Sequence, residues 1–216
     1  MDKKFVIWGC SGHAKVLADL IKNKNWCIEA FFDNKQVQTI EKGVPVYFGE
    51  HGFHTWLRQQ KNIDNIYALV AIGGHGGADR IKIQKLFREA GLKLDAIIHP
   101  TAYVCGSATL GAGTQVLAQA VVAASSMLGD ACIVNHKASV DHDCVVGAGV
   151  HLAPGATVCG CVTIENNVMV GANAVVLPRL KIGSGSIIGA GAVISKDVPP
   201  DSTIVGNPGR PIIRQF

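Results

Sequence analysis

An aliphatic residue recurs at every sixth position through the C-terminal half of this 216-residue chain. The series runs from Ile98 to Ile194, and all seventeen of its positions hold isoleucine, valine or leucine. Four residues after each of them the side chain is small or aliphatic, as at Ala102, Ala120 and Cys132. Chance does not produce such a series, and a fixed period identifies a chain built from stacked structural repeats.

We interpret the repeat as a parallel β-helix with three flat faces, one six-residue repeat per face and eighteen residues per coil. The aliphatic residue then points into a narrow triangular prism, and the small residue fits beside it where the wall bends. Glycine, Asn and Asp occupy the corners, where a positive φ is often needed. Seventeen repeats make between five and six coils, so the prism is roughly 27 Å tall at about 4.8 Å per coil.

The first 97 residues follow a different pattern, in which buried apolar runs alternate with segments of helical spacing. This alternation predicts a small parallel α/β domain, half of a doubly wound dinucleotide fold and therefore half-Rossmann-like. The predicted domains are 1–97 and 98–216, with a short C-terminal tail after Pro199 that packs over the last coil. The apolar runs are FVIW, IEAFF and NIYALVA, and the helical segments are HAKVLADLIKN and ADRIKIQKLFREA.

Composition excludes several classes of function. The net charge is +4 without a run of basic residues, which argues against nucleic acid and allows an anionic small ligand. The N-terminal residues lack the apolar region of a signal peptide, and no apolar segment reaches the roughly 18 residues of a membrane span. Seven scattered cysteines favour reduced thiols over disulfides or zinc. We therefore expect a cytoplasmic protein without membrane insertion.

Two glycine-rich turns follow strands of the predicted N-terminal sheet. GCSGHAK (residues 9–15) places backbone N–H groups at a helix N-terminus, where an anion is favoured. Its spacing is not that of a full dinucleotide fingerprint. Asp33 ends the second strand, where an acid commonly binds a ribose or a base, and IGGHGG (residues 72–77) forms a turn on the same sheet edge. Together they indicate a mononucleotide or nucleotide-sugar site, although a glycine that only turns the chain remains an alternative.

The stretch VNHKASVDHDC (residues 134–144) occupies two successive corners of the predicted prism. His142 points outward, and the residue stacked on it one coil later, Gly160, has no side chain, which leaves room for a ligand. Asp141 and Asp143 flank His142, so a carboxylate can fix the tautomer of the imidazole. This arrangement suits a general base. The alternative is a set of exposed polar corner residues, which every β-helix has.

A metal site is not expected from the histidines. His136 and His142 lie one repeat apart, so they occupy adjacent corners instead of converging, and His151 lies elsewhere again. No metal is predicted.

Taken over its whole length, the chain resembles bacterial sugar acyltransferases of the sialic acid O-acetyltransferase type. The likeness is strongest to the N-acetyltransferases of nucleotide-linked 4-amino sugars, such as that of the UDP-bacillosamine pathway. It rests on GCSGHAKVLAD, FFDN, VNHKASVDHDC, VHLAPGATVCG and VGNPGRP. The resemblance implies a left-handed β-helix, acetyl-CoA as co-substrate, and a homotrimer with active sites in the grooves between neighbouring prisms.

The resemblance also implies roles for individual residues. His142 matches the catalytic base and Asp143 the acid that orients it, where the family often has the longer glutamate. His151 and Gly160 match positions near the thioester and pantetheine arm of the cofactor, and Asn135 matches an asparagine at the sugar end. The residues assigned to the nucleotide-sugar pocket are Ser11, Gly12, His13, Asp33, Asn34 and Gly73.

The function implied by the resemblance is acetylation of the 4-amino group of a nucleotide-linked, UDP-type amino-deoxy sugar for surface glycan biosynthesis. Two other classes remain open at this point: an O-acetyltransferase acting on sialic acid or another sugar hydroxyl, and a non-catalytic β-helix scaffold. The glycine turns with Asp33 favour a nucleotide-bound substrate over a free sugar acid. The grouping of His142, Asp143 and Gly160 argues against a passive scaffold.

Overall fold

The computed structural model describes residues 3–212, and their contacts divide the chain into two compact units. The first unit contains residues 3–72 and 82–95, and the second contains residues 73–81 and 96–212. Residues 73–81 precede the domain boundary predicted at residue 97, yet they share most of their contacts with the β-helix. The exact boundary stays a prediction.

The first unit is built on a parallel four-stranded sheet in the order β3-β2-β1-β4. This arrangement confirms the predicted half of a doubly wound α/β fold. The strands are β1 (Lys4–Trp8), β2 (Cys27–Asp33), β3 (Val46–Phe48) and β4 (Ile66–Val70). The helices of the chain are α1 (Gly12–Asn23), α2 (Gly49–Arg58) and α3 (Gly77–Glu89), whose first residues belong to the second unit.

Both faces of β1 are buried, as expected for a parallel sheet covered on two sides. Val6 and Trp8 belong to a cluster rich in aromatic side chains from β2, α2 and the C-terminal part of α3. Within it, the rings of Phe32 and Phe53 meet edge to face with centroids 5.2 Å apart, and Phe53 meets Phe87 in the same way at 5.3 Å. The aromatic residues of the chain are few but concentrated here.

The carboxyl ends of β1, β2 and β4 meet at one edge of the sheet. The turn after β1 passes so close to the end of β4 there that residue 9 must be glycine. Its φ is +103°, and a Cβ there would lie 2.7 Å from the carbonyl oxygen of Ala71. The Gly9 N–H donates to the carbonyl of Phe32 at 2.7 Å. The turn after β1 is thereby fixed beside the ends of both neighbouring strands.

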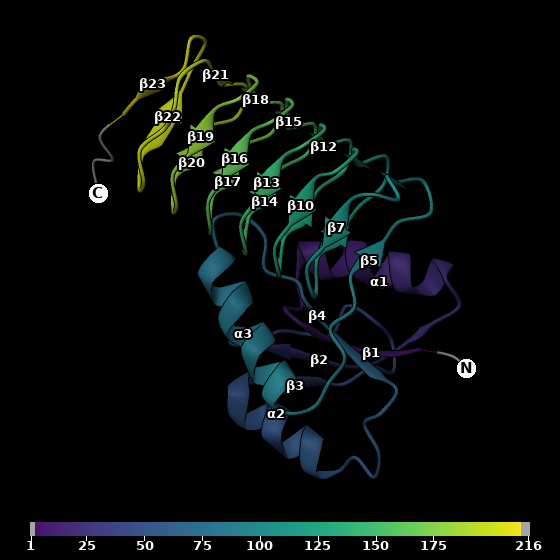
Figure 1. The fold of residues 1–216 in the computed structure, drawn as a ribbon. Coiled ribbons are helices and arrows are strands. Elements are labelled where there is room, and N and C mark those ends of the chain that lie inside the picture. Colours follow the sequence, from purple (N-terminus) through teal and green to yellow (C-terminus); the bar gives the residue numbers. More distant parts are fainter. Residues whose placement is uncertain (1–2, 213–216) are drawn as a thin grey trace. The chain divides into compact units, whose positions relative to one another are not determined.

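The second unit is the predicted left-handed parallel β-helix, in which two-residue strands stack into three sheets (Figure 1). The first face contains β5 (Ile97–Ile98), β8 (Gln115–Val116), β11 (Ile133–Val134), β14 (His151–Leu152), β17 (Met169–Val170), β20 (Ile187–Ile188), β22 (Thr203–Val205) and β23 (Arg210–Pro211). The second face contains β6 (Tyr103–Val104), β9 (Val121–Val122), β12 (Ser139–Val140), β15 (Thr157–Val158), β18 (Val175–Val176) and β21 (Val193–Ile194). The third face contains β7 (Thr109–Leu110), β10 (Met127–Leu128), β13 (Val145–Val146), β16 (Thr163–Ile164) and β19 (Lys181–Ile182).

The second residue of each short strand is the aliphatic one of the repeat, and these side chains form the core of the prism. The small residue that follows at the bend is buried beside it, as at Ala120 and Ala138. Where the small residue is polar, it donates to a carbonyl of the next coil: Ser126 Oγ to Asp141 O at 2.5 Å, and Cys144 Sγ to Cys159 O at 3.1 Å. The buried donors are therefore satisfied, which explains why Ser and Cys replace alanine there.

The start of α3 packs directly on the prism wall within the second unit. Gly77 is required at this contact, because a Cβ there would overlap the carbonyl oxygen of Gly149. Arg80 is fully buried, and it donates from Nε to Ala131 O at 2.9 Å and from Nη2 to Gly149 O at 2.6 Å. Burial lowers the pKa of Arg80 to about 10, so the guanidinium remains charged at neutral pH. A buried cation thus joins this helix to two coils.

All seven cysteines are free thiols, as the sequence predicted. Among residues 3–212, no helix is long and apolar enough to span a bilayer.

Replacing Arg80 with Leu should lower the free energy of unfolding by about 2–4 kcal/mol, because two buried carbonyls lose charged donors. Urea denaturation measures this difference. Lys85→Ala on the same helix is the control, since Lys85 is exposed and pairs with exposed Glu89 at 3.7 Å; its effect should stay within about 0.5 kcal/mol. Equal stabilities of Arg80→Leu and wild type would contradict a stabilising role for Arg80.

Candidate active site

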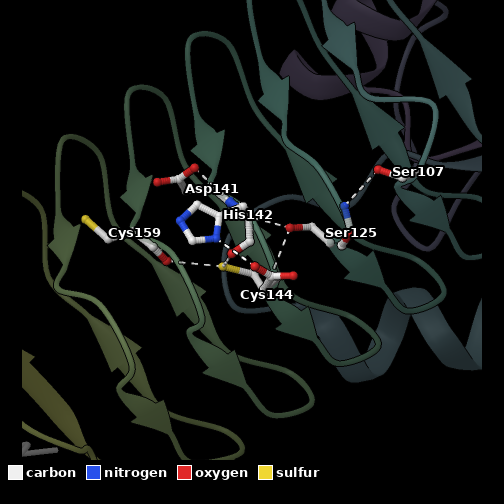
Figure 2. A network of polar contacts seen from close by, with 8 residues as sticks. Ser107, Ser125, Asp141, His142, Cys144 and Cys159 are labelled. Atoms are coloured by element: carbon white, nitrogen blue, oxygen red, sulfur yellow. Dashed lines mark hydrogen bonds and ion pairs between the residues drawn. The ribbon is translucent and has the colours of Figure 1, made fainter.

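His142 lies at the corner where the chain passes from β12 on the second face to β13 on the third. The ladder of backbone bonds fixes this corner between its neighbours, with Asp143 N–H donating to Ala124 O at 3.0 Å and Cys161 N–H donating to His142 O at 2.9 Å. Figure 2 shows His142 at this edge of the coils, near the side chains of Asp141 and Cys144. The corner therefore holds His142 in a fixed backbone position.

His142 and Asp143 form a hydrogen-bonded pair on the surface of the prism. The distance from His142 Nδ1 to Asp143 Oδ2 is 2.8 Å, and the side chains are 54% and 59% exposed. Asp143 has a φ of +57°, a conformation that aspartate tolerates better than most residues. Because a carboxylate only accepts, Nδ1 carries the proton in the neutral imidazole and Nε2 keeps its lone pair. This is the tautomer that a general base needs.

The second aspartate beside His142 does not reach the ring. Asp141 Oδ1 instead accepts the backbone N–H of His142 at 2.8 Å. The pKa of His142 is raised above its ordinary value of 6.5, first by the hydrogen bond to Asp143 and then by the charge of Asp141. The positive charge of Arg179 opposes this shift. Since the pKa is raised, the proton-accepting neutral form appears only at a higher pH than in free histidine.

Gly160 lies under the imidazole of His142, in the next coil. A Cβ on Gly160 would lie 2.6 Å from His142 Nε2 and 2.7 Å from Cε1. The sequence suggested that this glycine leaves room for a ligand beside the ring, but the ring of His142 itself occupies much of that room. The contact between Gly160 and a cofactor stays a prediction.

The turn that carries His142 is also held from inside the prism. The buried hydroxyl of Ser126 accepts the N–H of Cys144 at 3.2 Å and donates to Asp141 O. Both ends of the turn from Asp141 to Cys144 are therefore tied to one side chain of the preceding coil.

A second polar cluster lies on the first face, at the predicted residues Asn135 and His151. Asn135 Oδ1 accepts the N–H of His136 at 2.8 Å, which directs its Nδ2 toward His151 Nε2 at 3.2 Å. His151 Nδ1 lies 3.2 Å from the carbonyl oxygen of Gly74, which can only accept, so Nδ1 carries a proton in this contact. His151 is buried, and both ring nitrogens serve contacts inside the chain. Its predicted contact with the cofactor stays a prediction.

The glycine loop that contains Gly73 belongs to this second cluster. The carbonyl of Gly74 accepts from His151, and a Cβ on Gly73 would lie 3.9 Å from the His151 ring. The structure thus brings Gly73, Asn135 and His151 together within the second unit, whereas His142 and Asp143 lie at a different corner of the prism.

The remaining predicted substrate residues gather at the carboxyl edge of the sheet in the first unit. Asp33 Oδ2 accepts the N–H of Cys10, and its Oδ1 accepts the N–H of Lys35, each at 2.9 Å. The acid therefore already stabilises two turns. Ser11 precedes α1 without using its side chain as a cap, and Gly12 begins the helix. His13 and Asn34 lie beside them in the sequence, and Asn34 is exposed.

Several residues important to these clusters were not predicted. Arg80 gave no signal, since one basic residue on an amphipathic helix is usually exposed. Gly77 carried a weak signal, because paired glycines at the start of a helix suggest a close approach. Cys161 gave no signal of its own among the scattered thiols of the sequence. It lies one coil beyond Asp143, and among residues 3–212 His142, Asp143 and Cys161 form a set of possible metal ligands.

Comparison with known proteins agrees with both units. Residues 4–84 match the PglD N-terminal domain, and residues 161–196 match the bacterial transferase hexapeptide repeat. The acetyltransferase domain of PglB from Neisseria gonorrhoeae, solved with acetyl coenzyme A, is 35% identical, with 98% of this chain and 100% of that chain covered and a TM-score of 0.87. The chain belongs to this family of hexapeptide-repeat sugar N-acetyltransferases.

Other solved members of the family have the same fold. PerB from Caulobacter crescentus, solved with CoA and GDP-perosamine, is 33% identical over 97% of both chains with a TM-score of 0.87. WeeI from Acinetobacter baumannii is 27% identical, with 97% of this chain and 100% of that chain covered and a TM-score of 0.85.

Curated relatives match over a shorter segment. A 2,3,4,5-tetrahydropyridine-2,6-dicarboxylate N-acetyltransferase of Staphylococcus aureus is 38% identical over 77 residues, which is 32% of each protein. The chain spans between a quarter and a third of the length of the first curated relatives that it matches.

Gly160→Ala should displace the imidazole of His142 and slow acetyl transfer at least tenfold, since the new methyl group would lie 2.6 Å from Nε2. Gly106→Ala is a matched control: Gly106 occupies the same place at the same corner three coils earlier, and a Cβ there meets no atom within 4 Å. Steady-state kinetics measures the difference, with circular dichroism to verify the fold. Equal losses in the two variants would contradict a role for Gly160 in placing the ring.

The raised pKa of His142 should fall when Asp143 is replaced by Asn, because the charged hydrogen-bond acceptor is its largest cause. Asp141→Asn should lower the pKa less, since its oxygen still accepts the backbone N–H while only the charge is lost. Titration of the imidazole resonances by NMR from pH 5 to 9 measures all three values. An unchanged pKa in Asp143→Asn would show that the pair does not persist in solution.

Proposed function

We propose that this protein transfers the acetyl group of acetyl-CoA to the 4-amino group of a nucleotide-linked amino-deoxy sugar, with His142 as the general base. The observation that carries the proposal is the His142–Asp143 pair, exposed at a corner of the prism with Nε2 as the acceptor. We further propose that the sugar is UDP-linked, as in bacillosamine synthesis, and that the product serves surface glycan assembly in the cytoplasm.

The proposed reaction forms one bond and breaks one. The amine nitrogen attacks the thioester carbonyl, the C–N bond forms, and the C–S bond breaks to release CoA. His142 Nε2 accepts the amine proton, and Asp143 stabilises the resulting imidazolium through Nδ1–H. A neutral amine is already a good nucleophile, so the placement of the two substrates also contributes to the rate.

The first unit supports binding of the nucleotide part. A Cβ on Gly12 would meet no atom within 4 Å and its φ is not positive, so neither packing nor backbone conformation requires a glycine at this helix N-terminus. Close approach of a phosphate to the backbone gives a reason for it. A groove of about 330 Å³ lies in this unit, and part of its lining follows Asp33 closely in the sequence. The lining residues are Lys35, Gln36, Val37, Gln38, Val46 and Phe48. The exposed ring of Phe48 offers a stacking surface for a base.

The relatives favour N-acetylation of a nucleotide sugar over the alternatives. PerB was solved with both CoA and GDP-perosamine, and it is named a perosamine N-acetyltransferase. An O-acetyltransferase of sialic acid and a non-catalytic scaffold are therefore less favoured. The structure of PerB contains a GDP-linked sugar, whereas we propose a UDP-linked one, so the nucleotide is the part of the proposal that the experiment below must decide.

A homotrimer is proposed as the active assembly. The second and third faces flank His142, and their strands direct apolar side chains outward that nothing in the described part of the chain covers. Those exposed residues are Tyr103, Val121, Met127 and Val145. A neighbouring prism would bury them and close a groove beside His142.

The proposed function is tested with wild type and His142→Asn on UDP-, GDP- and dTDP-linked 4-amino sugars and on their 4-hydroxy counterparts. We expect only amino sugars to accept acetyl groups, with a kcat/KM that rises with pH through the raised pKa of His142. His142→Asn keeps the volume and loses the base, so its rate should fall by about 10²–10⁴-fold at neutral pH. An unchanged rate and pH profile would exclude His142 as the base. Acceptance of hydroxy sugars alone would exclude the N-acetyltransferase.

A further inference from the structure

Cys161 lies one coil beyond the His142–Asp143 pair, at the equivalent corner position. Its N–H donates to His142 O at 2.9 Å, and the residue before it, Gly160, is the one over which the imidazole lies. Its Sγ lies within 4.8 Å of a ring nitrogen of His142 and of a carboxylate oxygen of Asp143. Nothing in the proposed acetyl transfer uses this thiol.

The three side chains offer a soft thiol, a borderline imidazole and a hard carboxylate as metal ligands that lie close together. One ligand atom from each of His142, Asp143 and Cys161 lies within 4.8 Å of the other two. His142 and Asp143 are exposed and Cys161 is half-buried, so an ion can enter from solvent. We propose that these three residues form an inhibitory site for Zn²⁺, with water in the fourth position.

The geometry requires only a small adjustment for this purpose. Zinc bonds of about 2.0–2.3 Å in a tetrahedral arrangement place two ligand atoms roughly 3.5 Å apart. No pair of these atoms is more than 4.8 Å apart, so the widest pair must close by at most about 1.3 Å, which rotation of side chains at an exposed corner supplies. The carboxylate of Asp141 adds a nearby negative charge, and Arg179, at the same corner of the following coil, opposes it.

The donor set selects among metal ions. A thiolate with an imidazole suits Zn²⁺ or Co²⁺, whereas Mg²⁺ and Ca²⁺ need several oxygen ligands. A single carboxylate is too few for the hard cations. Mg²⁺ is therefore a negative control for the site.

A zinc ion bound to His142 prevents the imidazole from accepting a proton. A neutral imidazole has one free nitrogen lone pair, and its other nitrogen carries the proton. If zinc takes that lone pair at either nitrogen, no lone pair remains to accept the proton of the amine. Inhibition therefore rests on the proposed function of His142, whereas binding of the ion does not.

The binding test uses full-length protein without a histidine tag. Equilibrium dialysis against Zn²⁺, with metal content measured by mass spectrometry, is combined with Co²⁺ titration to detect sulfur-to-cobalt charge transfer. Wild type should bind about one ion per chain through this site, and Cys161→Ala should bind at least tenfold more weakly and lose the charge-transfer band. Cys159→Ala is the matched control, because Cys159 lies two residues away on the same turn, outside the set. Equal zinc binding by wild type and Cys161→Ala, or no binding by wild type, would overturn the proposal.

The activity test separates the zinc site from the proposed function. Without metal, Cys161→Ala and wild type should acetylate an accepted amino sugar at equal rates. Added Zn²⁺ should inhibit wild type and Cys159→Ala, EDTA should restore them, and Cys161→Ala should need at least tenfold more Zn²⁺. Mg²⁺ should have no effect on any of them. Zinc that binds through Cys161 without slowing the reaction would overturn the inhibitory role of the site, whereas the kinetics of His142→Asn tests the proposed function separately.

Discussion

The eighteen-residue period of the backbone ladder is the constraint on which the rest of the second unit depends. The first residue of most of these strands donates its N–H to a carbonyl seventeen residues later, as from Gln115 to Cys132 at 2.9 Å. The corners donate in the other direction, as from Asp143 to Ala124. A shift of the pairing register by one residue would turn the core side chains outward, so these bonds fix the register. Each corner residue therefore has a fixed neighbour in the preceding and in the following coil. The geometry around His142 follows from that stacking.

The same stacking explains the electrostatics of the corner. His142 is held beside Asp143 by sequence adjacency and beside Asp141 by the turn that Ser126 ties from inside. The side chain remains exposed, so its pKa is raised by neighbouring acids and not by burial. An exposed base of this kind needs a second surface to exclude water. The uncovered apolar side chains on the two flanking faces are consistent with the neighbouring prism that we propose.

The period-six pattern was sufficient to predict the β-helix, its inward residues and the stacking of Gly160 on His142, since these depend only on repetition. The proximity of Asp33 to the first glycine turn also followed from parallel strands, although its hydrogen bond to the N–H of Cys10 did not. The cluster of His151, Asn135 and Gly74 and the burial of Arg80 could not be predicted. Each depends on contacts between the 73–81 segment and the prism wall, and no period or local spacing encodes them.

Gly160 shows what a repeat fold reveals about individual residues. Glycine at a corner is normally explained by a positive φ, but the φ of Gly160 lies outside that region. In the same column of the prism, His142 and Ala124 carry side chains one and two coils before residue 160, so the fold itself accepts a side chain there. The three atoms nearest to a Cβ at residue 160 all belong to the ring of His142, which makes a side chain there unacceptable. The glycine is therefore a property of the functional corner and not of the β-helix, and the neighbouring column, in which Cys161 stacks on Asp143, places the Cys161 thiol within 4.8 Å of that ring's nitrogen.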